Sequence, residues 1–235
     1  MLEEIEAVQR ERKEYREYIE QWIHEVKTPI TAIRLLCENH RSDTSRELLG
    51  ELEHIKPLYG AGPLLRRSEE TQRDYLIRET PLGDVIHGAV ADNKYLLRRH
   101  QVKVEVEDAG ICACTDDKWL RFLLDQLISN AIKYRGSEPK LRFVAGERQG
   151  RVFLAVEDNG IGIPESDLPR IFDKGFTGTN GRLQKSSTGI GLYLCRKLCG
   201  KLGIGLTAES GGRGKGTRME LTFPVDDFIA EVQEK

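Results

Sequence analysis

Residues 151 to 164 read RVFLAVEDNGIGIP, and this stretch decides how most of the chain folds. The run from 151 to 157 is rich in valine, alanine and other apolar residues and predicts a strand, with Asp158 at its end. Gly160 and Gly162 follow at alternate positions, where glycine allows unusual backbone angles and a close approach to a ligand. A carboxylate at a strand end can accept a hydrogen bond from an exocyclic amine such as that of adenine. A simple turn gives the same pattern, so the interpretation depends on the rest of the chain.

The residues on both sides of this stretch carry alternating strand and helix patterns. Gln149-Gly150 predicts a hairpin turn between two strands, and Pro81 suits the first turn of a helix. The segment 111–114 is expected to pair with the alternating Val102, Val104 and Val106 of 101–107. The expected strands are 75–79, 101–107, 111–114, 141–146, 151–157, 204–209 and 217–223. The expected helices are 81–99, 116–134 and 192–202, the last of them after a glycine-rich region over 158–191.

Composition limits the class of protein. The chain has 235 residues, which suits two domains, and 39% of them are apolar, which is enough for a folded core. The 36 basic and 38 acidic residues give a net charge of -2, so we expect no nucleic-acid partner. No apolar run approaches a membrane span, and the charged first residues do not resemble a signal peptide.

The cysteines favour a reducing compartment. Five of them is an odd number without the spacing of a secreted disulfide framework, which fits the cytosol. Cys112-Ala113-Cys114 is the one pair with a spacing that suggests metal or redox chemistry. It is not C-x-x-C and has no second pair nearby, so ordinary packing in a short strand is the better interpretation.

The first 70 residues predict a helical hairpin. Ile19, Trp22, Val26, Ile33 and Leu36 recur at helical spacing over one long helix of about 40 residues. The residues 42–45 offer the start of a second helix, and so short a loop makes the two helices antiparallel. Two helices make a poor core, so we expect a homodimer with a four-helix bundle. Pro57, Gly60, Gly62 and Pro63 predict a break or sharp kink in the second helix.

Two more segments carry chemistry. In SSTGIGLYL (186–194), glycines open a helix whose free N–H groups suit phosphates, although a plain helix start gives the same pattern. It is neither a Walker loop nor a dinucleotide fingerprint. In LLDQLISNAIKY (123–134), Asn130 offers an oxygen that Mg²⁺ accepts, and Lys133 lies on nearly the same face. An interior asparagine with a local role is the alternative.

Together these segments resemble the nucleotide-binding domain shared by histidine kinases, gyrase, Hsp90 and MutL. The four boxes of that family occur in order over residues 75–225. They are the N box (Asn130, Lys133 and Tyr134), the G1 box (Asp158, Gly160 and Gly162), the F box IFDKGFTG (171–178) and the G2 box (Gly189, Gly191 and Leu192). The residues 179–187 correspond to the lid over ATP. The resemblance assigns ATP binding to Asn130, Lys133, Tyr134, Asp158, Gly160, Gly162, Phe172, Phe176, Thr188, Gly189, Gly191 and Leu192, and Mg²⁺ binding to Asn130.

The segment HEVKTPI (24–30) resembles the H box of histidine kinases. In that family the histidine takes the γ-phosphoryl group of ATP, so the resemblance makes His24 the phosphoacceptor. A neutral imidazole is a nucleophile near pH 7, and the adjacent Glu25 can accept a proton from its other nitrogen and orient the ring. Thr28 lies one turn on, where the family orients water to dephosphorylate the regulator. Pro29 would bend the helix beside the site, which explains a residue that is costly in a helix.

The resemblance therefore implies an α+β protein with three parts. These are a dimerising phosphotransfer hairpin (1–70), an α/β-sandwich ATP-binding domain (75–225) and a C-terminal tail (226–235). The implied function is the cytoplasmic core of a two-component sensor histidine kinase, a signal-transducing transferase and phosphoprotein that uses ATP and Mg²⁺. Its expected partners are a second copy of the chain and a response-regulator receiver domain, for which it is also expected to act as a phosphatase.

The resemblance is strongest to the intramembrane-sensing, bacitracin-sensor-type branch, judged from QWIHEVKTPI and RRSEETQRDYLIRE. It implies a membrane sensor region or transporter upstream and a full-length protein anchored in the cell membrane. A soluble kinase that starts at Met1 is the alternative.

Two other functions stay open. An ATP hydrolase of the gyrase, Hsp90 or MutL kind has a glutamate four residues before the N-box asparagine, but Gln126 stands there and cannot act as a general base. The second alternative is a degenerate kinase that serves as a dimeric scaffold. The expected break at 57–63 favours it mildly, because the regulator docks on the hairpin in this family and a break would alter that surface.

Overall fold

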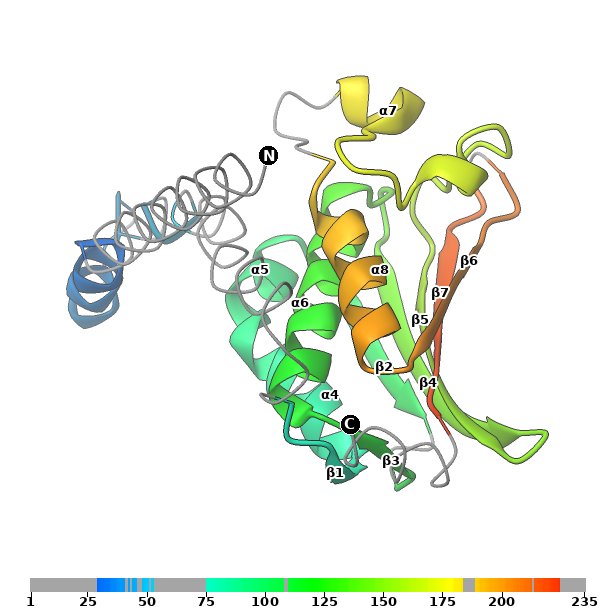
Figure 1. The fold of residues 1–235 in the computed structure, drawn as a ribbon. Coiled ribbons are helices and arrows are strands. Elements are labelled where there is room, and N and C mark those ends of the chain that lie inside the picture. Colours follow the sequence, from blue (N-terminus) through cyan, green and yellow to red (C-terminus); the bar gives the residue numbers. More distant parts are fainter. Residues whose placement is uncertain are drawn as a thin grey trace, which may run out of the picture. The chain divides into compact units, whose positions relative to one another are not determined.

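The computed structural model describes residues 29–40, 42, 44–45, 48–50, 52, 75–107, 110–183, 189–212 and 214–224 (Figure 1). The chain divides into two compact units, Met1–Thr71 and Gln72–Lys235. Several predictions fall outside the described residues: the break at 57–63, the tail at 226–235, and the site residues His24, Glu25, Thr28 and Thr188.

In the first unit, the described residues form parts of two helices. Residues 29–39 are helical, and the backbone N–H of His40 donates to the carbonyl of Leu36 at 3.0 Å. Ser42 Oγ accepts a hydrogen bond of 3.0 Å from the backbone N–H of Ser45, which is the bond that an N-cap serine makes. The predicted helix start at 42–45 is confirmed by this cap.

The second unit is built on a five-stranded sheet with the order β2-β4-β5-β7-β6. β2 runs parallel to β4, and the other neighbours are antiparallel. Gln149 and Gly150 have φ angles of 54° and 73°, as in the tight turns that match the twist of a hairpin, and they join β4 to β5 as predicted. The strands are β2 (Lys103–Glu107), β4 (Lys140–Arg148), β5 (Arg151–Asp158), β6 (Gly205–Glu209) and β7 (Thr217–Thr222).

A separate two-stranded sheet corrects one pairing. β3 (Cys112–Thr115) pairs antiparallel with β1 (Arg78–Pro81), so the predicted pairing of 111–114 with 101–107 was wrong. Thr80 Oγ1 donates to the Thr115 carbonyl at 3.2 Å across this pair. Alternation identifies a strand but not its partner, and here long-range packing makes that choice. Cys112 and Cys114 are half-buried strand residues.

The predicted helix from 81 to 99 is two helices, α4 (Leu82–Asp92) and α5 (Lys94–Arg99). Pro81 is extended, with φ -65° and ψ 114°, and ends β1 instead of opening the helix turn. The interruption lies at Asn93, which is buried. Its Nδ2 donates to the carbonyl of Ala89 at 2.9 Å and to Asp125 Oδ1 at 2.7 Å, so the side chain ties the junction of the two helices to Asp125.

α4, α6 (Asp117–Lys133) and α8 (Gly191–Lys201) cover one face of the five-stranded sheet (Figure 1). The N-cap of α6 is Asp116, whose carboxylate accepts hydrogen bonds from the backbone N–H groups of Lys118 and Trp119. The same carboxylate accepts a hydrogen bond of 2.9 Å from the backbone N–H of Leu76, 40 residues earlier in the chain. Phe122 of α6 is only half-buried. The buried side of α6 consists of Trp119, Leu120, Leu123, Leu124, Leu127, Ile128 and Ile132. In the described part of the chain, no helix has the length and apolar character needed to cross a bilayer.

Candidate functional site

Asp158 ends β5 and lies half-buried in the sheet, opposite Leu141 of β4 and Thr217 of β7. Its Oδ1 accepts a hydrogen bond of 2.8 Å from the backbone N–H of Gly160, and the backbone N–H of Thr217 also donates to the carboxylate. Burial raises the pKa of Asp158 above that of an ordinary carboxyl, and these two hydrogen bonds partly oppose the rise. The result is an oriented acceptor at the end of a central strand.

The loop that follows Asp158 is held between the end of α6 and the segment 210–216. The N–H of Ile161 donates to the carbonyl of Tyr134 at 2.9 Å, and the N–H of Gly214 donates to the carbonyl of Ile161 at 2.7 Å. Gly162 has a φ of +69°, and a Cβ there would overlap the carbonyl oxygen of Gly212. Both facts require glycine, which explains the spacing noted in the sequence.

The N-box residues lie in the last turn of α6 and at its end. Tyr134 is the C-cap, and its N–H donates to the carbonyl of Asn130 at 2.9 Å. Lys133 Nζ lies 5.8 Å from the centre of the Tyr134 ring, and partial burial lowers the pKa of Lys133. All three side chains are half-buried, and the Tyr134 carbonyl joins them to the loop after Asp158.

The F and G2 boxes are joined by their backbones. The N–H of Gly175 donates to the carbonyl of Gly189 at 3.0 Å. Gly189 has a φ of +65°, and a Cβ there would lie 2.7 Å from the nitrogen of Phe176, so a side chain would not fit. The predicted lid between these boxes begins with a short helix, α7 (Gly178–Leu183), while 184–188 lie outside the described residues. Asp167 Oδ2 accepts from the N–H of Thr179 in its first turn at 2.9 Å.

The two aromatic residues of the F box each lie beside an arginine. Phe172 is buried, with the guanidinium of Arg196 at 5.2 Å from its ring centre, and Phe176 is half-buried, with that of Arg170 at 4.7 Å. Cation–π contacts of this kind fix the rings at the base of the lid.

α6 and α8 meet at Gly191. A Cβ on Gly191 would lie 2.9 Å from Gln126 Oε1, so the glycine leaves room for this carboxamide at the start of α8. Leu192 is half-buried in the same turn. The N and G2 boxes are therefore neighbours. The side chain between them, that of Gln126, is a carboxamide, which cannot act as a general base toward water.

Backbone hydrogen bonds thus join the described site residues in two groups. One group is the N box with the G1 box, and the other is the F box with the G2 box. The contact between α6 and α8 places the N box beside the G2 box. The sequence prediction missed the segment 210–216, where Ser210 Oγ accepts from the N–H of Ile163 at 2.9 Å and donates to the carbonyl of Gly216 at 2.7 Å. Its four glycines in SGGRGKG were the available signal.

Among the residues with described positions, no group of three or more His, Cys, Asp or Glu side chains could hold a metal ion.

Family models match two regions of the chain. Residues 115–227 match the family described as histidine kinase-, DNA gyrase B- and HSP90-like ATPase. Residues 13–152 match a model described as EcoEI R protein C-terminal. This second match crosses between the compact units and ends at the start of β5, so it would divide the β4–β5 hairpin and corresponds to no folding unit.

Relatives that match along the chain decide the family. The chain is 34% identical over 207 residues to sensor histidine kinase GraS of Staphylococcus haemolyticus, covering 87% of this chain and 59% of that protein. It is 33% identical to sensor histidine kinase YxdK of Bacillus subtilis over 88% of this chain and 64% of that protein. With GraS of Staphylococcus epidermidis the identity is 31% over 99% of this chain and 67% of that protein. The chain belongs to the sensor histidine kinases. This kinase spans less than two thirds of the first two relatives.

Solved structures confirm the predicted α+β fold of this kinase. Its second unit resembles the catalytic domain of histidine kinase ThkA, with a TM-score of 0.55 and 22% identity over 63% of this chain and 97% of that one. Acinetobacter baumannii histidine kinase AdeS gives a TM-score of 0.60 and 21% identity over 86% of this chain and 98% of that one. Full-length ShkA in complex with AMPPNP gives a TM-score of 0.64 and 18% identity over 88% of this chain and 45% of that one.

Proposed function

We propose that this kinase phosphorylates its own His24 from MgATP and passes the phosphoryl group to an aspartate of a response-regulator receiver domain. The observation that carries the proposal is the oriented carboxylate of Asp158, held by Gly160 and Thr217 in a loop that is hydrogen-bonded to the N-box helix. Family membership supplies the reaction class.

For ATP, the two ends of the site offer different chemistry. Asp158 is an acceptor for the exocyclic amine of adenine, and its two backbone donors fix the direction of the carboxylate. For the phosphates, the first turn of α8 would offer backbone N–H groups, and Lys133 would supply a positive charge. We therefore propose that the base of the nucleotide binds at Asp158 and its phosphates bind near α8.

Mg²⁺ fits the same site with one protein ligand. Asn130 is half-buried in the last turn of α6, and its amide oxygen is the kind of hard donor that Mg²⁺ takes. Because no carboxylate cluster occurs among the described residues, the remaining ligands would come from the phosphates and water, as is common for Mg²⁺. Bound there, Mg²⁺ would neutralise charge on the transferring phosphoryl group.

At the H box, the proposed roles rest on the family. His24 is the nucleophile, Glu25 accepts a proton from its second ring nitrogen, and Thr28 orients the water that dephosphorylates the regulator. Positioning and charge stabilisation supply most of the catalysis in phosphoryl transfer, so these residues need little covalent chemistry beyond the imidazole.

We also propose that the kinase is a homodimer through its helical hairpin. Support comes from large apolar side chains that a single chain leaves exposed in the first unit, a surface that costs free energy unless it is covered. These are Ile33 at 41%, Leu35 at 54%, Leu36 at 60% and Leu48 at 47% exposure. A monomer in sedimentation equilibrium at micromolar concentration would exclude this assembly.

The remaining proposals concern the whole protein. We propose that the chain is the cytoplasmic part of a membrane-anchored kinase of the intramembrane-sensing branch, with a sensor region or transporter upstream. The relatives that it matches are longer than the matched region, which is consistent with such a part. Fractionation of cells that express the full-length protein tests the anchoring.

Autophosphorylation with γ-labelled ATP and Mg²⁺ tests the central proposal. The parent should acquire an acid-labile, base-stable label, and His24→Gln should not. His40→Gln is the matched control, because His40 is an exposed histidine at the end of the same predicted helix and should leave the label unchanged. A parent that binds ATP and stays unlabelled, or a His24→Gln variant that keeps the label, would contradict the proposal.

A further inference from the structure

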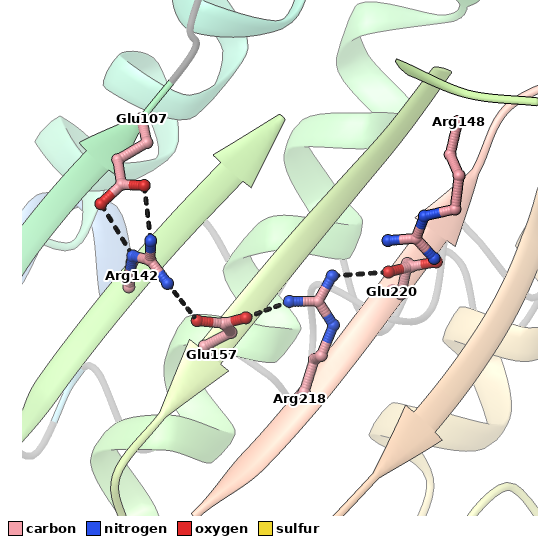
Figure 2. A network of polar contacts seen from close by, with 6 residues as sticks. All are labelled: Glu107, Arg142, Arg148, Glu157, Arg218 and Glu220. Atoms are coloured by element: carbon pink, nitrogen blue, oxygen red, sulfur yellow. Dashed lines mark hydrogen bonds and ion pairs between the residues drawn. The ribbon is translucent and has the colours of Figure 1, made fainter. Parts of the chain in front are cut away.

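Six charged side chains form a continuous ladder across the sheet (Figure 2). It starts on β2, crosses β4 and β5, and ends on β7 and the far end of β4. Successive residues of a strand point to opposite faces, so Glu157 lies on the face away from the buried Val156 and from Asp158. In order along the ladder the members are Glu107, Arg142, Glu157, Arg218, Glu220 and Arg148.

The ladder is most protected around Arg218, which lies between Glu157 and Glu220. The side chains of Glu157 and Arg218 are each 26% exposed and that of Glu220 is 17% exposed, whereas Glu107 at one end is 45% exposed and Arg148 at the other is 61% exposed. Solvent screens the ends strongly and the centre less. Any energetic effect of the ladder is therefore concentrated at the two ion pairs of Arg218, with Glu157 and with Glu220.

Glu157 is bound on both sides. One carboxylate oxygen accepts from Arg218 of β7, and the other accepts from Arg142 of β4 at 3.0 Å. Arg218 also donates to Glu220 at 2.6 Å, so the guanidinium bridges two carboxylates. These bonds tie the end of β5 to both neighbouring strands.

The position of this pair matters because of its neighbours. Glu157 faces Arg218 in the strand register, and the next pair, Asp158 with Thr217, is the last one between β5 and β7. The Thr217 N–H is one of the two donors that orient the Asp158 carboxylate. Fraying of this strand end would move that donor away from Asp158.

We infer that Glu157 and Arg218 are positioning residues for recognition of the adenine base. Their ion pair on the outer face holds β5 against β7, and this keeps the Thr217 N–H on the Asp158 carboxylate on the inner face. The inference rests on the proposed binding of ATP by Asp158. It adds a specificity function to residues that do not touch the nucleotide.

The test compares the affinity for ATP with that for inosine triphosphate, which has an oxygen in place of the amine of adenine. Glu157→Gln keeps the size of the side chain and removes its charge. We expect the ratio of the two affinities to fall by roughly threefold, the effect of weakening a partly exposed ion pair. Glu107→Gln is the matched control, since Glu107 pairs with the same Arg142 but lies on β2, away from Asp158, and should leave the ratio unchanged.

A second variant keeps the positive charge. Arg218→Lys has one compact ammonium group that cannot bridge Glu157 and Glu220 as the guanidinium does, so the ratio should fall by less than in Glu157→Gln. If the two residues had a purely structural role, the variants would have a lower melting temperature and would bind both nucleotides more weakly by the same factor. The ratio of the two affinities would then be unchanged.

The outcomes separate the inference from the proposed function. A parent that prefers ATP, with a Glu157→Gln variant that keeps the full preference, overturns the inference alone. Equal loss of preference in Glu107→Gln also overturns it, because the effect would not be local. A parent that binds both nucleotides equally overturns the role of Asp158 and the inference with it.

Discussion

Replacing Gly162 with alanine should destabilise the ATP-binding unit by about 3 to 4 kcal/mol. A φ of +69° costs an alanine about 1 to 2 kcal/mol. The new Cβ would overlap the Gly212 carbonyl and come within 3.0 Å of Ser210 Oγ, so the 210–214 segment must move. That movement breaks the 2.9 Å bond from Ile163 to Ser210 and the 2.7 Å bond from Gly214 to Ile161, each worth about 1 kcal/mol.

Gly150→Ala separates these contributions. Gly150 has a φ of +73° with no heavy atom within 4 Å of the added Cβ, so this variant carries the backbone cost without the overlap. Both variants also reduce the freedom of the unfolded chain by the same amount. The difference between them should therefore be about 2 kcal/mol, the contribution of the two hydrogen bonds.

Urea denaturation measures both variants. Trp119 is buried, with its ring centre 5.8 Å from that of Tyr75, so its fluorescence reports on the unit that holds Gly162. A Trp22→Phe background removes the other tryptophan. A difference of less than about 0.5 kcal/mol between the variants would refute the overlap argument, because that is the range of ordinary surface substitutions.

Four further predictions follow from the site. Burial raises the pKa of Asp158 in the folded state, so the folded protein loses stability as the pH rises from the ordinary carboxyl pKa to the raised one. Asp158→Asn should remove this loss and stabilise the protein against urea at pH 7. The same variant should weaken the binding of ATP, measured by calorimetry, roughly tenfold or more. Asn130→Ala should abolish autophosphorylation through lost Mg²⁺ binding, and full activity would refute the metal assignment. Thr28→Ala should keep autophosphorylation and slow dephosphorylation of the regulator, and an unchanged rate would remove that role. Asp116→Ala should lower the free energy of unfolding in urea by about 2 kcal/mol, because three backbone N–H groups lose their acceptor. A decrease no larger than that of an ordinary surface substitution would show that water replaces the carboxylate as the acceptor.

Local signals predicted much of the second unit. The hairpin turn at Gln149-Gly150 occurs where the pattern placed it, and α6 and α8 each start within one residue of the predicted position. All three features depend on residues close in sequence. Gly162 has a positive φ, which is a local property of the backbone, whereas Gly160 is required by the Tyr134 carbonyl oxygen, which an added Cβ would overlap.

Long-range contacts explain the errors. The expected helix is interrupted at Asn93, whose amide donates to Asp125 far along the chain. β3 pairs with β1 although its sequence fits either strand. The segment 210–216 has glycines but no apolar period, and it becomes part of the site only through its bonds to Ile161 and Ile163.

The sequence by itself determined the family, the order of the boxes and the residue types that a nucleotide requires, because these depend on spacing and on side-chain chemistry. Only the tertiary structure decided which backbone groups orient Asp158 and which charges support it from the other face. Thr217 is far from Asp158 in sequence, and Glu157 meets Arg218 only through the register of β5 with β7. Register is set by how a whole sheet packs on its helices, so no local pattern contains it.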